Sequence, residues 1–333
     1  MDIINLEVKH IVAVFGFLSI GTSLVMIFVQ IFMLIALFKD TKLIKNNYVY
    51  LIIGSIGFVE LIQQIIMLIG GIYFVVFVKP SFIIERILGA IMGSCYLFIA
   101  VLQLYLSLTR VNIFFRFSSA KDKINKDILI KSILILSTIY ICFLIFYSSN
   151  TFRIDINLNE CGWIFRDDEE NYRRYSHIDS IVYLLLNLLT LVAFIAVIVK
   201  INISKSKTTT YNDKKIWETR LLELRLSFQA ITHFVYTAIL HFFFVLTKTS
   251  YPTYTNFLRI LNLIWTLSVG CNTILNLIFV RNIRNLFLKS TFCLKNNKKK
   301  SRKVKNVVMK NFKIARINIC HQNSCMKILP TES

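Results

Sequence analysis

The sequence predicts an all-α membrane protein: a bundle of seven transmembrane helices with the N-terminus outside the cell, the C-terminus in the cytoplasm and a short amphipathic eighth helix. Three observations support this prediction. Hydrophobic residues make up 56% of the 333 residues. Seven apolar segments reach the length of roughly 20 residues that crosses the hydrocarbon core of a bilayer. Basic residues are concentrated in alternate loops, as expected when one set of loops faces the cytoplasm.

The seven apolar segments account for most of the chain. Several are longer than a span requires, which allows tilt or helical extension beyond the bilayer. Residues 1–10 are then a short extracellular N-terminus, residues 11–292 the bundle with its amphipathic helix, and residues 293–333 a basic cytoplasmic tail. The predicted spans are Ile11–Phe38, Tyr48–Val78, Ile87–Phe115, Ile128–Tyr147, Ile181–Ile201, Leu226–Leu246 and Phe257–Val280.

The charges of the loops and the tail predict the orientation. From Arg281 onward the chain carries fourteen Lys or Arg and a single acid, Glu332. The loops after the first, third and fifth spans are also basic, whereas the loop 149–179 is acidic on balance. The positive-inside rule therefore predicts a cytoplasmic C-terminus. The net charge of +21 follows from this asymmetry, so it indicates contact with anionic lipid and argues against nucleic-acid binding.

The cysteine positions give no disulfide framework. Of the seven cysteines, only Cys161 lies in a predicted outside loop. Cys95 precedes Arg110 by 15 residues, or about 22 Å along a helix, which places it inside the bundle. Whether Cys161 forms a disulfide is therefore left open by the sequence.

Glu60 is the sole carboxylate in the interior of a predicted span, and Gln63 and Gln64 lie one turn further along the same helix. An intramembrane acid is costly, so Glu60 should face the interior of the bundle, either protonated or paired. Two interpretations are open: Glu60 is a structural hydrogen-bond node, or it is a conformational or ion-linked switch.

Arg110 ends the third span, directly after Leu108 and Thr109. Because a charged side chain is costly in hydrocarbon, Arg110 should lie at the cytoplasmic boundary. Taken alone, it is equally compatible with an anchor whose charged end reaches the membrane surface. In the seventh span, Asn272 and Asn276 are four residues apart on one helix face, and both need partners within a bundle.

The seventh span is followed by an amphipathic pattern. Ile283 and Phe287 are apolar, whereas Arg284 and Lys289 are basic, which predicts a short helix lying in the membrane interface. Cys293 follows this helix and is a candidate for acylation, because juxtamembrane cysteines can be palmitoylated. An unmodified thiol is the alternative.

These residues resemble a known family. Glu60 in the second span, Arg110 ending the third, and Asn272 through Arg284 ending the seventh are similar to the three signatures of rhodopsin-like G-protein-coupled receptors. Within that group the chain is most similar to nematode serpentine chemoreceptors, particularly those called class T. The stretches that carry this likeness are Gly70-Gly71 through Pro80 to Gly89, Cys161-Gly162-Trp163-Ile164-Phe165 and Trp265-Thr266-Leu267-Ser268-Val269-Gly270.

The chain departs from the usual form of each signature. Thr109 stands in place of the acid before the arginine, and Val111 in place of the tyrosine after it. Thr273 and Asn276 stand where proline and tyrosine are usual. The sixth span has no tryptophan, and the outer end of the third has no cysteine. Spans four to seven contain no proline, so any kink in them must arise in another way.

The resemblance implies a chemosensory receptor that binds a small environmental chemical in the outer half of the bundle and activates a heterotrimeric G protein at the inner face. Arg110, Thr109, Asn272 and Asn276 would serve activation and coupling. Glu60 and Ser268 would form an intramembrane polar switch. Side chains of suitable chemistry and depth for the ligand pocket are Gln64, Cys95, Tyr96, Tyr236, His241, Asn262 and Trp265.

The same resemblance implies a multi-pass protein of the cell membrane in contact with membrane lipids, with sensory cilia as one location consistent with it. It implies no cofactor, no metal and no catalytic residue.

Two other classes of protein are alternatives. Some chemosensory channels have seven helices, but their N-terminus is inside, contrary to the charge bias. A transporter would be expected to show internal repeats or helices broken by Gly and Pro near the midplane, and neither is evident. A membrane enzyme would need a cluster of metal ligands or a nucleophile, whereas the five histidines are scattered at positions 10, 177, 233, 241 and 321.

Overall fold

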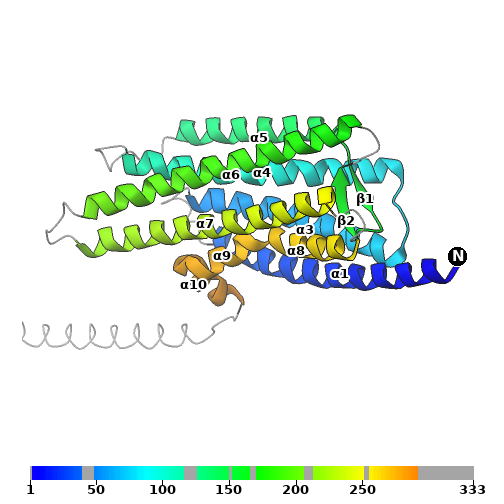
Figure 1. Ribbon diagram of the computed structural model, residues 1–333. Helices are drawn as coiled ribbons and strands as arrows, with labels where there is room; N and C mark the ends of the chain where they lie inside the picture. Colours follow the sequence, from blue (N-terminus) through cyan, green and yellow to red (C-terminus); the bar gives the residue numbers. More distant parts are fainter. Residues whose placement is uncertain are drawn as a thin grey trace, which may run out of the picture. The chain divides into compact units, whose positions relative to one another are not determined.

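The protein is largely helical (Figure 1). The computed structural model describes residues 2–39, 49–115, 126–149, 152–165, 170–205, 213–250 and 255–291. The chain divides into two units, Met1–Phe287 and Leu288–Ser333. Both β-strands and the helices up to Phe279 lie in the first unit, and residues 292–333 of the second, including Cys293, lie outside the described residues.

The elements are α1 (Asp2–Lys39), α3 (Val49–Val76), α4 (Phe82–Phe115), α5 (Lys126–Ser148), β1 (Ile154–Asn157), β2 (Gly162–Phe165), α6 (Glu170–Lys205), α7 (Asp213–Ser250), α8 (Thr255–Val269), α9 (Cys271–Phe279) and α10 (Arg281–Thr291).

Each predicted span coincides with a helix or, for the last span, with the pair α8 and α9. Over the described residues, five helices are long and apolar enough to cross a membrane, namely α1, α3, α4, α5 and α6, and the bent pair α8 and α9 would make a sixth. The helix α7 contains Gln229, His233 and His241 among its apolar residues and is not in this group. The expectation of an all-helical, membrane-type architecture is therefore confirmed in its coarse form.

Most helices extend beyond the predicted apolar segments. α1 begins at Asp2, so much of the predicted N-terminal segment 1–10 is helical. α4 begins at Phe82 and α6 at Glu170, several residues before the predicted spans. A helix satisfies its own backbone hydrogen bonds, so it can continue past the apolar segment into a polar environment. The apolar pattern therefore predicted where helices occur better than where they begin.

The last predicted span is broken at Gly270. The axes of α8 and α9 differ by 48°, and Gly270 has φ −98° and ψ 6°, in the bridge region rather than the helical region. A Cβ atom on Gly270 would lie only 2.5 Å from Met26 Cε of α1. Glycine thus allows α1 to approach the break closely, and it supplies a bend in a span that has no proline.

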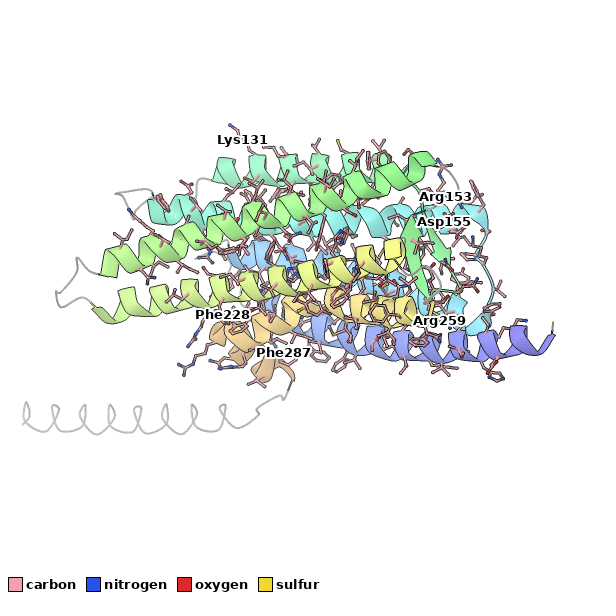
Figure 2. All side chains as sticks on the ribbon, in the orientation of Figure 1. Lys131, Arg153, Asp155, Phe228, Arg259 and Phe287 are labelled. Carbon is pink, nitrogen blue, oxygen red and sulfur yellow. The ribbon has the colours of Figure 1, made fainter. Side chains whose placement is uncertain are left out.

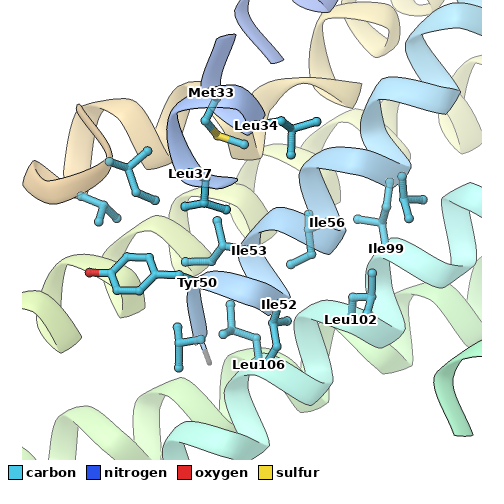
Figure 3. Close-up of a cluster of buried hydrophobic side chains, with 14 of the residues drawn as sticks. Met33, Leu34, Leu37, Tyr50, Ile52, Ile53, Ile56, Ile99, Leu102 and Leu106 are labelled. Atoms are coloured by element: carbon cyan, nitrogen blue, oxygen red, sulfur yellow. The ribbon is translucent and has the colours of Figure 1, made fainter. Parts of the chain in front are cut away.

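The main apolar core lies between α1, α3 and α4. Figure 3 shows Leu37, Ile53 and Leu102, one from each helix, within this cluster. In a lipid environment the surroundings are as apolar as leucine itself, so these contacts stabilise the bundle through close packing rather than through transfer from water. The cluster continues to Val280 and Ile283, which joins the start of α10 to the same core.

An antiparallel hairpin of two strands packs at the end of the bundle where α1 begins (Figure 1). Ile154 pairs with Phe165 and Ile156 with Trp163. Ile154, Ile156 and Trp163 are buried in a second apolar cluster that includes Tyr147 of α5. The sequence analysis predicted no strands here, because each is only four residues long. We refer to this side of the molecule as the hairpin end.

Glycines allow this hairpin to pack closely, which gives a first prediction. A Cβ atom on Gly89 of α4 would lie 2.1 Å from the carbonyl oxygen of Ile154, so Gly89→Ala must displace the hairpin. We expect the substitution to lower the free energy of unfolding by about 1–3 kcal/mol, as overpacking does. Thermal unfolding of the purified protein in detergent measures this loss.

Gly21→Ala is the matched control for Gly89→Ala. Gly21 also lies within a long helix, but a Cβ atom there would meet nothing within 4 Å. Alanine has the higher helix propensity, so this variant should be as stable as the parent or slightly more so. Equal unfolding temperatures for the two variants would contradict the close packing of the hairpin on α4.

Candidate functional site

Glu60 joins three helices through hydrogen bonds. Its carboxylate accepts a bond from Asn272 Nδ2 at 2.7 Å and one from Thr273 Oγ1 at 2.9 Å, both on α9. Gln30 Nε2 of α1 donates a third, longer bond of 3.4 Å. Glu60 itself lies on α3 and is only 1% exposed. We call Glu60, Gln30, Asn272 and Thr273 the Glu60 node.

The donors in the Glu60 node are neutral amides and a hydroxyl. A buried carboxylate is tolerated only when its oxygens accept hydrogen bonds or when it carries a proton. The node therefore satisfies Glu60 without a lysine or arginine. Sequence analysis predicted that Glu60 would face the bundle interior and that Asn272 would need a partner, and the structure brings these two residues together. The contributions of Gln30 and Thr273 were not predicted from the sequence.

Two other predicted site residues lie outside the node: Ser268, expected to form the polar switch with Glu60, and Asn276, expected to serve activation and coupling. The hydroxyl of Ser268 donates to the carbonyl oxygen of Trp265 at 2.7 Å, a local bond within α8. Asn276 is buried one turn after Asn272, and its Oδ1 atom has no hydrogen-bond partner among the described residues. Both asparagines line the same cavity.

This cavity lies between α3, α4, α6, α7 and α9, and we call it the polar cavity because amide and hydroxyl side chains reach its otherwise apolar wall. It has about 30 Å³ of room for water-sized molecules, and a single water needs roughly 10–15 Å³ of such room. Like Asn276 Oδ1, the Oε1 atom of Gln229 is buried and accepts no bond within the described part of the chain. The cavity therefore combines space with unmet hydrogen-bonding capacity. Its lining residues are Ile53, Ile56, Gln103, Leu106, Thr190, Phe194, Gln229, Ala230, Asn272 and Asn276.

A second polar contact links α4 to α7 beside this cavity. Gln103 Nε2 and His233 Nδ1 are 3.4 Å apart, and both residues are buried. Neither residue was singled out as a site residue from the sequence. A glutamine in the middle of an apolar helix is a detectable signal, because a polar group inside a bundle needs a partner on another helix.

Arg110 is buried at the end of α4 opposite the hairpin. The residue is 2% exposed, and the preceding Thr109 is also buried. In this conformation, the guanidinium group is enclosed by the bundle rather than displayed on its surface. A burial of this depth differs from that of an anchoring arginine, whose charged end reaches water.

The hairpin end of the bundle contains an ion-pair network. Arg153 Nη2 lies 3.2 Å from Glu85 Oε2 of α4, and Arg153 Nε pairs with Asp155. Glu85 Oε1 also accepts a bond of 2.9 Å from the backbone N–H of Ile156. The Arg153 guanidinium lies 4.3 Å from the centre of the Phe82 ring, in a cation–π arrangement. Figure 2 shows Arg153 and Asp155 at this end of the bundle.

The helix α8 is also tied to the hairpin turn. Arg259 Nε donates to the carbonyl oxygen of Asn159 at 2.6 Å, and Asn262 Nδ2 donates to that of Glu160 at 2.9 Å. Cys161 follows directly and is a free thiol. Burial raises the pKa of this thiol to about 11, against the opposing effect of Arg259. The thiol therefore stays protonated and poorly reactive at neutral pH.

The residues predicted to form a ligand pocket are only partly brought together. Tyr96 and Trp265 meet edge to face with ring centres 5.9 Å apart. Gln64 instead bonds the backbone of α8, donating to the Thr266 carbonyl oxygen at 2.8 Å. Asn262 lies under the hairpin turn. None of the seven predicted residues lines the polar cavity.

The remaining predicted pocket residues make local packing contacts. Cys95 Sγ lies 3.7 Å from the Tyr140 hydroxyl, and the Tyr236 hydroxyl donates to the Ile264 carbonyl oxygen at 3.1 Å. The ring of His241 is centred 6.5 Å from that of Tyr183. These contacts join neighbouring helices.

Sequence analysis missed a group of residues around Asp179. The Tyr147 hydroxyl donates to Asp179 Oδ1, and Tyr183 stacks on Tyr96 with ring centres 4.1 Å apart. Asp179 lay just before a predicted span, and so was assigned to the loop. The detectable signal was the spacing of Asp179 and Tyr183, four residues apart on one helix face.

The described residues contain no group of three or more His, Cys, Asp or Glu side chains that could hold a metal ion. No protein-family model matches the chain, and no curated protein matches it either.

The Glu60 node and the polar cavity give a second prediction. Asn272→Leu removes the 2.7 Å bond to Glu60, so it should lower the free energy of unfolding by about 2–3 kcal/mol, as expected for a bond to a buried carboxylate. Gln229→Leu removes an amide whose Oε1 atom has no described partner, so it should raise stability by about 1–2 kcal/mol.

Both substitutions replace a buried amide that lines one cavity by the same apolar residue, so each serves as the control for the other. Thermal unfolding of the purified variants in one detergent measures the difference. If Asn272→Leu unfolds at the same temperature as Gln229→Leu or above it, the Glu60 node does not stabilise the bundle.

Proposed function

We propose that the chain is a G-protein-coupled chemosensory receptor similar to the class T serpentine receptors of nematodes. It would bind a small environmental chemical at the hairpin end of the bundle and activate a heterotrimeric G protein at the opposite end. The observation that carries the proposal is the Glu60 node, in which an acid within one span is bonded to Asn272 and Thr273 directly after a helix break. The node joins two of the three stretches that resemble receptor signatures.

The proposed arrangement has seven spans. α7 would be the sixth span and the pair α8 and α9 the seventh, with the N-terminus and the hairpin outside the cell and the C-terminus in the cytoplasm. α10 would lie in the membrane interface as an eighth helix, which its apolar Ile283 and Phe287 beside basic Arg284 support. The protein would be a multi-pass protein of the cell membrane, and sensory cilia are a location consistent with its role.

The proposed mechanism is a shift between two conformations. A ligand held between the hairpin, α4, α6 and α8 would move α8, whose Arg259 and Asn262 already bond the hairpin turn. Since α8 and α9 meet at a bend at Gly270, such a movement can change the position of α9 relative to Glu60. The activated form would then expose Arg110, which is enclosed in the present conformation.

Arg110→Ala gives a third prediction. Removal of the guanidinium should reduce activation of a heterotrimeric G protein by about tenfold or more, because one charge-assisted contact corresponds to at least that factor. Nucleotide exchange on a purified G protein, with the receptor reconstituted in vesicles, measures basal and odorant-stimulated activity. Surface expression of the variant should remain close to that of the parent.

Arg86→Ala is the matched control, because Arg86 lies on the same helix at the hairpin end and bonds the Ser148 carbonyl oxygen. This variant should keep its G-protein activation. If the two variants behave alike, Arg110 has no special part in coupling. A ligand-gated conductance in cells that lack the G protein would instead favour a channel.

The orientation gives a fourth prediction. An epitope tag on the C-terminus should be reached by antibody only after the cells are permeabilised, because the tail from Arg281 onward is strongly basic. A tag on the N-terminus should be reached on intact cells. Staining of intact cells through the C-terminal tag would overturn the proposed topology.

A further inference from the structure

Asp179 is a buried acid that has no cationic partner among the described side chains. The residue is 6% exposed and lies on α6, within the apolar stretch that begins at Ile178. Its only hydrogen bond comes from the Tyr147 hydroxyl to Oδ1, and Oδ2 accepts none from the residues that the structure describes. A carboxylate in such a place requires either a proton or a positive charge.

Two other acids buried at the hairpin end are paired. Glu85 contacts Arg153 and Lys79, and Asp155 contacts Arg153. These acids keep the hairpin in place, and their charges are balanced within the protein. Asp179 differs from them because none of the lysine and arginine side chains that the structure describes forms an ion pair with it.

Aromatic rings surround Asp179 and continue from it into the bundle. Tyr183 is four residues further along α6, so its side chain shares a helix face with Asp179. Tyr183 stacks on Tyr96 with ring centres 4.1 Å apart, and Tyr96 meets Trp265 at 5.9 Å. Tyr96 and Tyr183 are both close enough to Asp179 for electrostatic interaction. The rings thus form a continuous aromatic cluster beside the acid.

The chemistry of this arrangement fits an organic amine. An ammonium group bonds a buried carboxylate strongly and is also attracted to the faces of aromatic rings. An alkyl or aryl group attached to the ammonium would pack on the tyrosine rings and point towards Trp265. A neutral odorant would pack on the rings but leave the carboxylate unpaired. An acidic ligand would be repelled by the carboxylate.

We propose that Asp179, with Tyr147, Tyr183 and Tyr96, binds the ammonium group of a small organic amine. Tyr147 holds Oδ1 and thereby orients the carboxylate, which leaves Oδ2 for the ligand. Gly93 of α4 provides the space for the Tyr147 ring, because a Cβ atom there would lie 2.7 Å from its Cδ1 atom. This inference rests on the proposed receptor function for its signalling role, but the binding can be measured without a G protein.

The binding test uses the purified full-length protein in lipid nanodiscs. The probes are hexylamine and 2-phenylethylamine, with hexan-1-ol and 2-phenylethanol as neutral counterparts of the same shape. Saturating amine should raise the unfolding temperature by about 3–5 °C, and the alcohols should raise it by less than about 1 °C. Equal shifts with amines and alcohols, or no shift with either amine, would overturn the proposal.

Asp179→Asn keeps the shape of the side chain and an oxygen for Tyr147, and it removes the charge. We expect amine affinity to fall by about 10- to 100-fold, which is the contribution of one hydrogen bond between charged groups. Without amine, this variant should unfold at the same temperature as the parent or higher, because a buried unpaired charge has been removed. An unchanged amine affinity would show that Asp179 is only a structural partner of Tyr147.

Asp155→Asn is the matched control, since Asp155 is a buried acid at the same end that already pairs with Arg153. It should lower the unfolding temperature by breaking that pair, while the additional rise caused by amine persists. Loss of the amine effect in both variants would assign it to general disruption of the hairpin end and overturn the proposal.

A parallel measurement of G-protein nucleotide exchange separates this inference from the proposed function. Amine-dependent stabilisation that requires Asp179, without any G-protein activation, would support the amine site and contradict the receptor. Activation by neutral odorants that is retained in Asp179→Asn would support the receptor and contradict the amine site.

Discussion

A carboxylate enclosed in an apolar helix bundle must receive hydrogen bonds from neighbouring side chains, because the surrounding hydrocarbon offers none. Glu60 is in this position, and its partners come from α1 and α9. The requirement fixes the relative placement of three helices, of which α9 is far from α1 and α3 in the sequence. It also explains why α9 can start with a bend, since the bonds from Asn272 and Thr273 hold α9 against α3 directly after the break at Gly270.

At the hairpin end, buried acids are also satisfied by neighbouring groups, but here one of the donors is the charged guanidinium of Arg153. Glu85 of α4 accepts bonds from Arg153 and from the backbone of Ile156, so one buried acid fixes both a side chain and a strand. Cys161 is a free thiol, and the hairpin is held by this ion pair, by the bonds of Arg259 and Asn262 to the turn, and by the packing of Trp163. Noncovalent contacts of this kind can be broken and remade, whereas a disulfide would hold the hairpin permanently.

The sequence predicted the helices because a long apolar segment has few alternatives to a helix in a membrane. It also predicted the inward orientation of Glu60, because an intramembrane acid facing lipid is too costly. Both predictions rest on properties of a single segment. The Glu60–Asn272 contact was suggested only by the need of both side chains for a partner, and the sequence could not specify that Gln30 and Thr273 would join them.

The features that the sequence did not reveal depend on contacts between segments. The hairpin has four-residue strands with no extended alternating pattern, and its position depends on close approach to Gly89. Asp179 and Glu85 were assigned to loops because the predicted spans begin only at Ile181 and Ile87. In the structure, α6 and α4 begin earlier, and the two acids are buried. Span boundaries are thus the weakest part of a hydropathy argument, and they are where these charged side chains lie.

The pair α8 and α9 connects the two buried acid sites within a short stretch of chain. Trp265 on α8 contacts Tyr96, whose ring stacks on Tyr183 beside Asp179. Asn272 on α9 bonds Glu60. Trp265 and Asn272 are separated along the chain by a single bend, at Gly270. A tightly packed bundle cannot absorb a displaced ring without moving a neighbour, so under the proposed function a ligand that separates Tyr96 from Tyr183 would push on α8 near the bend. A change of angle at Gly270 would then strain or break the bonds of α9 to Glu60.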